Sequence, residues 1–169
     1  FAASQQAMQG AVIQMVSHGI NIVGLFIILD AIERRTGTRV ISELGGLVHQ
    51  APLLGVFFMI IVLGSIALPL TNGFVGEFLL LIGIFENHTV MAAVAGLTMI
   101  FGAVYMLWMY QRTMLGPEKV LYNEIRDLTP SELAALIPIV IAIFWIGLFP
   151  SFFLDTSFPD VVRLLQYLR

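Results

Sequence analysis

Two titratable side chains lie inside long apolar stretches of the sequence. Glu77 follows a run without charged residues that extends over residues 44–76. His18 lies within another uncharged run, residues 1–29. A carboxyl group can take up and release a proton, and an imidazole can relay one through either ring nitrogen. Because a titratable group is costly to place away from water, these two residues are the first candidates for proton transfer.

A polar stripe accompanies His18. Gln14, Ser17, His18 and Asn21 follow the spacing i, i+3, i+4 and i+7, which places them on one helix face. Such a stripe in a membrane helix relays protons or makes polar contacts with another helix, and the spacing favours neither. Glu77 also has two interpretations, a proton-transfer group or a charge that only stabilises a helix N-terminus. The position inside an apolar run favours transport, because a helix-end charge is cheaper to place at the surface.

The composition indicates an integral membrane protein. Hydrophobic residues make up 59% of the 169 residues and charged residues 11%, against about 45–50% and 25% in a typical soluble domain. A net charge of -3 argues against nucleic-acid binding, which needs a basic face. The sequence has no cysteine, and its three histidines show no metal-ligand spacing. The sequence therefore predicts no cofactor and no metal site in this chain.

Uncharged runs predict an all-α fold, a polytopic bundle of transmembrane helices. Helices are favoured because hydrocarbon cannot satisfy open strand edges, and one crossing needs about 20 apolar residues. We expect a single membrane domain over residues 1–169. Its four predicted spans are residues 9–32, 52–85, 89–112 and 131–149.

The second predicted span is too long for one upright helix. Its 34 residues would extend about 51 Å at 1.5 Å per residue. Residues that disturb a helix or tolerate non-helical backbone lie near its middle: Pro69, Asn72, Gly73 and Gly76. We expect two half-helices, about residues 52–68 and 73–85, with a break near 69–76, rather than one kinked helix. Discontinuous helices of this kind mark ion and substrate sites in transporters.

Helix-end signals surround the last predicted span. Thr129, Pro130 and Glu132 have the spacing of a capping box with proline at the first helical position. In residues 150–169, apolar side chains recur at helical spacing among polar ones. This tail is predicted to be a short interfacial amphipathic helix rather than a fifth span.

The basic residues predict the orientation of the chain. Six of the eight lie in the loops between the first and second spans and between the third and fourth: Arg34, Arg35, Arg39, Arg112, Lys119 and Arg126. The positive-inside rule makes these two loops cytoplasmic and both chain ends outward. The membrane is expected to be a bacterial inner membrane. Arg163 and Arg169 lie in the tail. Because the chain opens on Phe1, we expect a piece of a larger membrane protein.

Two segments resemble a known family. Residues 9–19, QGAVIQMVSHG, and residues 69–78, PLTNGFVGEF, resemble the subunit M (chain 4) family of proton-pumping NADH-quinone oxidoreductase, respiratory complex I. Asp155 and Thr156 after Pro150 also look like the end of that subunit, and the resemblance covers essentially the whole chain. The family belongs to a wider set of antiporter-like proteins that includes the multisubunit sodium/proton antiporters.

The resemblance implies a fourteen-helix subunit whose last four helices this chain provides. Glu77 would match the ionisable residue of the discontinuous helix, which is glutamate in subunit M and usually lysine in its sister subunits. His18 would match a histidine of the hydrated polar axis. The implied function is proton translocation driven by quinone reduction elsewhere in the complex, with neighbouring antiporter-like subunits and the lipid bilayer as partners. The alternatives are a sodium/proton antiporter subunit and a structural scaffold without a proton path.

Overall fold

Helices form all the regular structure of the described residues. The computed structural model describes residues 4–117 and 125–167, so Lys119 and Arg169 lie outside the described residues. The elements are α1 (Gln5–Thr36), a 3-10 turn η1 (Ile41–Glu43), α2 (Leu47–Gln50), α3 (Pro52–Ser65), α4 (Asn72–Phe85), α5 (Thr89–Met114), α6 (Pro130–Leu148) and α7 (Ser151–Tyr167). The predicted all-α class is confirmed.

Three of the helices, α1, α5 and α6, are long and apolar enough to cross a membrane. α1 is longer than the predicted span because both of its ends are capped. The Ser4 hydroxyl accepts a hydrogen bond from the Ala7 N–H at 3.2 Å, and Gly37 ends the helix with a φ of 72°. α3 and α4 are also apolar, but each has 14 residues. At 1.5 Å per residue each extends about 21 Å, less than the roughly 30 Å of hydrocarbon.

Residues 66–71, called the break below, separate α3 from α4. Two residues of the break that are not glycine have positive φ, Ala67 at 55° and Leu70 at 77°. Such backbone is strained and persists only where the surroundings enforce it. The Thr71 hydroxyl donates to the Leu68 carbonyl at 2.6 Å, which satisfies one carbonyl released from the helix.

The break lies earlier than the sequence predicts. The half-helices were expected at about residues 52–68 and 73–85, with a break near 69–76, whereas α3 ends at Ser65 and α4 starts at Asn72. Asn72, Gly73 and Gly76, which were assigned to the break, lie within α4. The Asn72 side-chain oxygen accepts a hydrogen bond from the Gly73 N–H at 3.0 Å. This bond satisfies a free donor of the new helix and allows α4 to start at Asn72.

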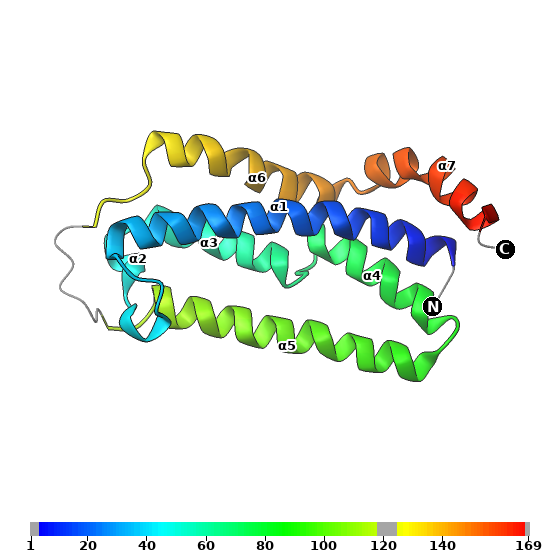
Figure 1. Ribbon diagram of the computed structural model, residues 1–169, viewed down its shortest axis with the longest axis horizontal. Coiled ribbons are helices and arrows are strands. Elements are labelled where there is room, and N and C mark those ends of the chain that lie inside the picture. The colour runs from blue at the N-terminus through cyan, green and yellow to red at the C-terminus, as the bar shows by residue number, and fades with distance from the viewer. Residues whose placement is uncertain (1–3, 118–124, 168–169) are drawn as a thin grey trace.

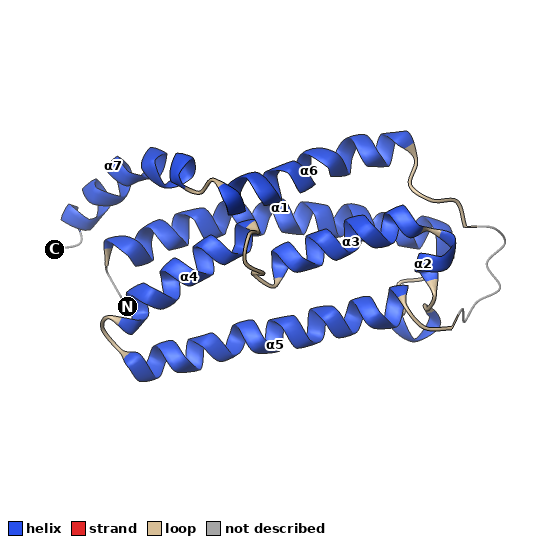
Figure 2. Ribbon diagram, turned by 180° about the vertical axis from the view of Figure 1, so that it is seen from behind, coloured by secondary structure: helices blue, strands red, loops and turns tan. Residues whose placement is uncertain are grey.

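The two short helices follow one another along α1, with the break between them (Figure 2). α6 packs on α1 and α4, and α5 returns along α4 and α3 (Figure 1). An apolar core joins α1, α3, α5 and α6 and includes the fully buried side chains Ile28, Leu54, Ile61, Met114, Leu136 and Ile143. α1 therefore contacts both short helices along its length.

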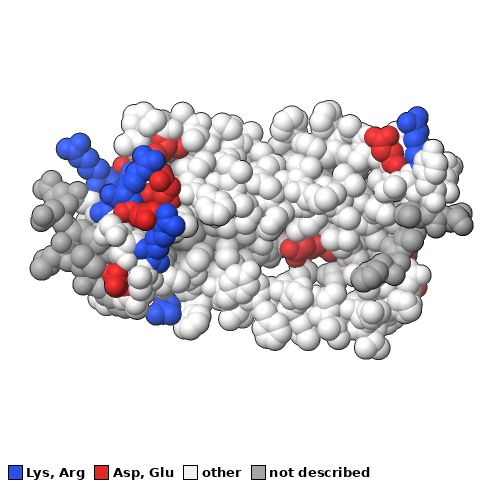
Figure 3. All heavy atoms as spheres, in the orientation of Figure 1, with Lys and Arg blue, Asp and Glu red and all other residues white. Residues whose placement is uncertain are grey.

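Most of the Lys and Arg side chains gather over one end of the molecule (Figure 3). This charged end includes Arg34, Arg35, Arg39, Arg126, Asp127 and Glu132. The Arg35 guanidinium donates to both Glu132 carboxylate oxygens, at 2.9 and 2.7 Å. Its three other N–H groups donate to the carbonyl oxygens of Ala31, Arg126 and Asp127. The pair joins the end of α1 to the start of α6.

The loop before α6 also fixes the start of α3. The Asp127 carboxylate accepts hydrogen bonds from the N–H groups of Leu53, at 2.8 Å, and Leu54, at 3.0 Å. A carboxylate is favourable there because the first amides of a helix lack partners and carry partial positive charge. The capping box of Thr129 and Glu132 is confirmed, with both of its hydrogen bonds formed.

The predicted tail helix forms as α7, immediately after Pro150. Its Val161 side chain is buried, whereas Asp160 and Arg163 are exposed. α7 packs against α1, where the Gln9 side chain donates to the Leu154 carbonyl at 3.4 Å.

Candidate functional site

The first turn of α4 is bound to the polar stripe of α1. Asn72 is fully buried, and its amide nitrogen donates to the Ser17 carbonyl at 3.2 Å and to the Asn21 side-chain oxygen at 3.1 Å. In return, the Ser17 hydroxyl donates to the Asn72 carbonyl at 3.1 Å. A fully paired buried polar network specifies one arrangement of the elements that carry it. The network therefore fixes where α4 begins and which of its faces points toward α1.

Small residues let α1 and α4 approach closely below this network. A Cβ atom at Gly76 would lie 2.9 Å from the Gln14 Cα atom, and one at Gly10 would lie 2.9 Å from the Leu80 backbone nitrogen. A Cβ atom at Gly83 would similarly collide with α1, 2.9 Å from a backbone nitrogen. Close backbone approach through small residues is typical of helix pairs in membranes.

Glu77 lies in the second turn of α4, on the side that meets Gln14. Its side chain is half-buried, and its carboxylate oxygen accepts a hydrogen bond from the Gln14 amide nitrogen at 3.3 Å. Within residues 4–117 and 125–167, no basic side chain forms an ion pair with Glu77. The Gln14 side-chain oxygen is buried and has no hydrogen-bond partner among the described atoms. The described residues therefore provide this carboxyl group with one amide hydrogen-bond donor and no fixed counter-charge.

α6 covers the break from the other side. A Cβ atom at Gly147 would collide with the backbone of Leu70 and Thr71. On α3, a Cβ atom at Gly64 would lie 3.1 Å from the side-chain oxygens of both Asn21 and Asn72. Gly147 therefore brings α6 against the break, and Gly64 brings α3 against the network. Neither glycine was among the candidate residues, although glycine in an apolar helix is a signal of close packing.

His18 does not share the buried face of its neighbours. Ser17 and Asn21 are buried and Gln14 is half-buried, but His18 is exposed on this chain. The four residues of the stripe cannot all face α4. Ser17 and His18 are about 100° apart around the helix, and the surface of α1 that contacts α4 is narrower than that. Pro69 is also exposed, in the outer part of the break. The structure thus brings together Gln14 and Glu77 and, separately, Ser17, Asn21 and Asn72.

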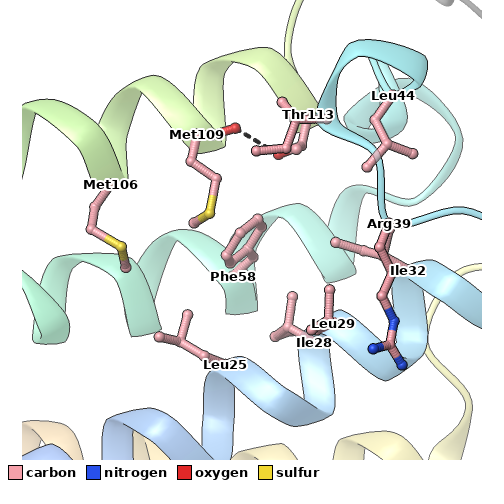
Figure 4. Close-up of a pocket in the computed structure, with 11 residues that line it drawn as sticks. Leu25, Ile28, Leu29, Ile32, Arg39, Leu44, Phe58, Met106, Met109 and Thr113 are labelled. Carbon is pink, nitrogen blue, oxygen red and sulfur yellow. Dashed lines mark hydrogen bonds between the residues drawn. The ribbon is translucent and has the colours of Figure 1, made fainter.

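An apolar pocket lies on the side of the molecule between α1, α3 and α5 (Figure 4). It has a volume of about 240 Å³, with Phe58 and Met106 in its lining and Arg39 near the charged end. The hydroxyl of Thr113 donates to the Met109 carbonyl at 2.9 Å and so offers the pocket no free donor. The lining provides no pair of titratable groups for proton transfer. In the described chain, no group of three or more histidines or carboxylates is arranged to hold a metal ion.

Comparisons with known proteins identify the family of this chain. Residues 1–102 match the family described as NADH:quinone oxidoreductase/Mrp antiporter, TM. NADH-quinone oxidoreductase subunit M of Rickettsia conorii is 40% identical over 168 residues, which cover 98% of this chain and 34% of the relative. NADH-ubiquinone oxidoreductase chain 4 of Marchantia polymorpha is 34% identical over 170 residues, 99% of this chain and 34% of the relative.

A solved structure has the same fold. A chain of respiratory complex I from Thermus thermophilus with bound NADH superposes with a TM-score of 0.91 at 29% identity, over 100% of this chain and 36% of that chain. The present chain spans about a third of the length of the curated relatives it matches. Its long apolar helices make it an integral membrane protein. The chain belongs to the NADH:quinone oxidoreductase/Mrp antiporter transmembrane family.

Proposed function

We propose that this chain is part of the proton-translocating subunit M of NADH-quinone oxidoreductase and that Glu77 carries protons. The observation that carries the proposal is the half-buried Glu77 carboxyl, which is hydrogen-bonded to Gln14 and lacks a basic ion-pair partner within the described chain. The names of the relatives support the assignment. The subunit would perform no redox chemistry and hold no cofactor, since quinone reduction elsewhere in the complex would drive the transport.

We also propose that α3 and α4 are the two halves of one discontinuous span, so that the chain crosses the membrane four times. Neither helix is long enough alone, and the two follow one another along α1. Non-helical backbone at membrane depth persists where protein or a watery cavity surrounds it. The packing of Gly147 and Gly64 around the break supports this placement. α7 would then lie at the membrane surface.

The charged end is proposed to face the cytoplasm of a bacterial cell. Arg34 and Arg35 lie in the last turn of α1, and Arg39 and Arg126 lie in the loops at the same end. Basic residues are retained on the cytoplasmic side of a membrane. Both chain ends would then face outward. The proposed partners are the neighbouring antiporter-like membrane subunits of the complex and the lipid bilayer.

His18 is proposed to relay protons at a contact outside this chain. Its side chain is exposed, and the neighbouring Gly19 also has open space beside it. A polar side chain in the middle of a membrane helix is unfavourable against hydrocarbon. We therefore place another protein segment or subunit against this side of α1, where the imidazole would continue the polar axis from Glu77.

The second candidate is a subunit of a sodium/proton antiporter, because the family description includes such proteins. The names of the relatives favour the oxidoreductase. The two functions differ in their driving force. NADH oxidation would drive proton transport by the oxidoreductase subunit, whereas a sodium gradient would drive proton transport by the antiporter without NADH.

The test compares Glu77→Gln with Glu86→Gln in the full-length protein in native membrane vesicles. Glutamine keeps the size of the side chain and removes the titratable proton. We expect the assembled Glu77→Gln variant to lose NADH-driven proton pumping, and Glu77→Asp to recover it in part. Glu86 is exposed beyond the end of α4, so its variant should pump normally. Normal pumping by a fully assembled Glu77→Gln variant would refute the proposed role.

A further inference from the structure

Among the described residues, Gln14 is the side chain that is hydrogen-bonded to the Glu77 carboxyl group. Its hydrogen bonding must therefore change when Glu77 is protonated. Its amide nitrogen donates to the Glu77 carboxylate at 3.3 Å, while the oxygen of the same amide is buried without a partner. A primary amide carries donors and an acceptor on one terminal group. Rotation by about half a turn exchanges their positions, and this terminal torsion has a broad, two-fold preference. The same side chain can thus offer a donor or an acceptor to Glu77.

We infer that Gln14 is a positioning residue that holds the Glu77 carboxyl against α1 in both of its protonation states by turning its amide. The inference rests on the proposed function, in which Glu77 gains and loses a proton during transport. An ionised carboxylate only accepts hydrogen bonds, so the amide nitrogen faces it. When a protonated water of the transport path transfers its proton to a carboxylate oxygen, the O–H bond of that water breaks and a new O–H bond forms on Glu77. The negative charge of the carboxylate is neutralised, and the donor is left as neutral water. The new O–H group then donates to the Gln14 oxygen.

Packing holds the rest of the contact between Gln14 and Glu77 in place, so that only the terminal amide of Gln14 can rotate. The stem of Gln14 is fixed, because Gly76 approaches so closely that a Cβ atom there would lie 2.8 Å from the Gln14 Cβ atom. One turn further along α1, Ser17 and Asn21 are bonded to Asn72. The backbones of α1 and α4 are therefore held together at this level, and the terminal amide can turn without moving either helix.

Titratable side chains of the other packed helices make their contacts elsewhere. In the described structure, Glu132 of α6 is paired with Arg35, and the Tyr110 hydroxyl of α5 donates to the Gly55 carbonyl at 3.1 Å. Arg112 of α5 stacks over the Trp108 ring at 5.1 Å. His18 of α1 is exposed, and Asp30, Glu33 and Arg34 lie further along α1, toward the charged end. Gln14 is thus the side chain whose hydrogen bonding changes directly with the Glu77 proton.

The test uses Gln14→Leu in the assembled complex, with Gln9→Leu as the matched control. Gln9 lies on the same helix but donates to a backbone carbonyl, which does not titrate. Infrared difference spectra between high and low pH report the C=O stretch of protonated Glu77, assigned as the band that Glu77→Gln removes. Loss of the acceptor should shift this band to higher frequency in Gln14→Leu and lower proton pumping about tenfold or more. Gln9→Leu should change neither.

Gln14→Asn provides a second variant. The asparagine side chain is shorter than glutamine by one methylene, so its amide cannot reach Glu77. The Glu77 band should therefore shift as in Gln14→Leu, although the residue at position 14 stays polar. An unchanged band in assembled Gln14→Leu or Gln14→Asn would overturn the inference about Gln14. If Glu77→Gln abolishes pumping in the same experiments, the proposed function of Glu77 stands while the inference about Gln14 fails. If Glu77→Gln pumps normally, the proposed function itself fails.

Discussion

Replacing Arg35 with methionine should destabilise the protein far more than the same change at Arg34. The side chains of Arg35 and Glu132 are only 11% and 18% exposed, and Arg35 makes five hydrogen bonds. Removing one partner of a buried ion pair costs about 3–5 kcal/mol, because the other charge is left uncompensated. Glu132 retains hydrogen bonds from the Thr129 N–H and hydroxyl, at 2.8 and 2.9 Å. We therefore expect the lower end of this range, about 3 kcal/mol.

Arg34 is a matched control one residue earlier in the same helix. Its ion pair with Asp30 is a surface contact, with the two side chains 71% and 53% exposed. An exposed pair four residues apart on a helix contributes about 0.3–0.5 kcal/mol. The measurement is the free energy of unfolding of both variants in the same detergent. Equal losses for Arg34→Met and Arg35→Met would refute the reasoning.

A double variant separates the uncompensated charge from the lost packing. Arg35→Met combined with Glu132→Gln removes both charges, and glutamine can still close the capping box with Thr129. Replacing both members of a buried pair is often close to neutral. The double variant should therefore recover most of the stability that Arg35→Met loses. A double variant as unstable as Arg35→Met would show that the charge left on Glu132 is not the cause.

Two further changes test the packing around the break. Gly147→Ala should lower the unfolding free energy by about 1–3 kcal/mol, because the new Cβ atom would overlap the backbone of the break. The control is Gly102→Ala on α5, which should be neutral or stabilising because open space surrounds Gly102. Asn72→Leu should cost about 1–3 kcal/mol, because the Asn21 oxygen loses its donor inside the protein. An unchanged unfolding free energy for Gly147→Ala or Asn72→Leu, measured in the same detergent assay, would contradict the packing described here.

Uncharged runs and helix-end residues predicted the helices well because their physical causes are local. α5 begins at Thr89 as predicted, and Thr129 caps α6 through its own neighbours in sequence. The break was harder to place. Ala67 and Leu70 carry its positive φ values, and neither residue type prefers such backbone. Pro69 and Gly73 indicated the break to within a few residues. No local signal marks the positive φ of Ala67 and Leu70, because tertiary packing imposes that conformation.

The candidate site shows a similar division. The stripe correctly indicated a polar face on α1, but the spacing alone could not show where the narrow contact with α4 ends. That boundary separates the buried Ser17 from the exposed His18. Gly76 was interpreted as part of a break, whereas its role is to let Gln14 approach α4. Deciding between the two roles of a glycine needs the position of the second helix.

The break joins two helices that are fastened to different parts of the protein. α3 is held at the charged end by the Asp127 carboxylate and by the Tyr110 hydroxyl, whereas α4 is held to α1 through Asn72. If the two helices shift relative to each other, residues 66–71 would act as the mechanical hinge, because they are the covalent link between them. The strained backbone of Ala67 and Leu70 would then limit how far α4 moves, because the surrounding packing holds it in one conformation. The Glu77 carboxyl group on α4 would return to the same position after each shift.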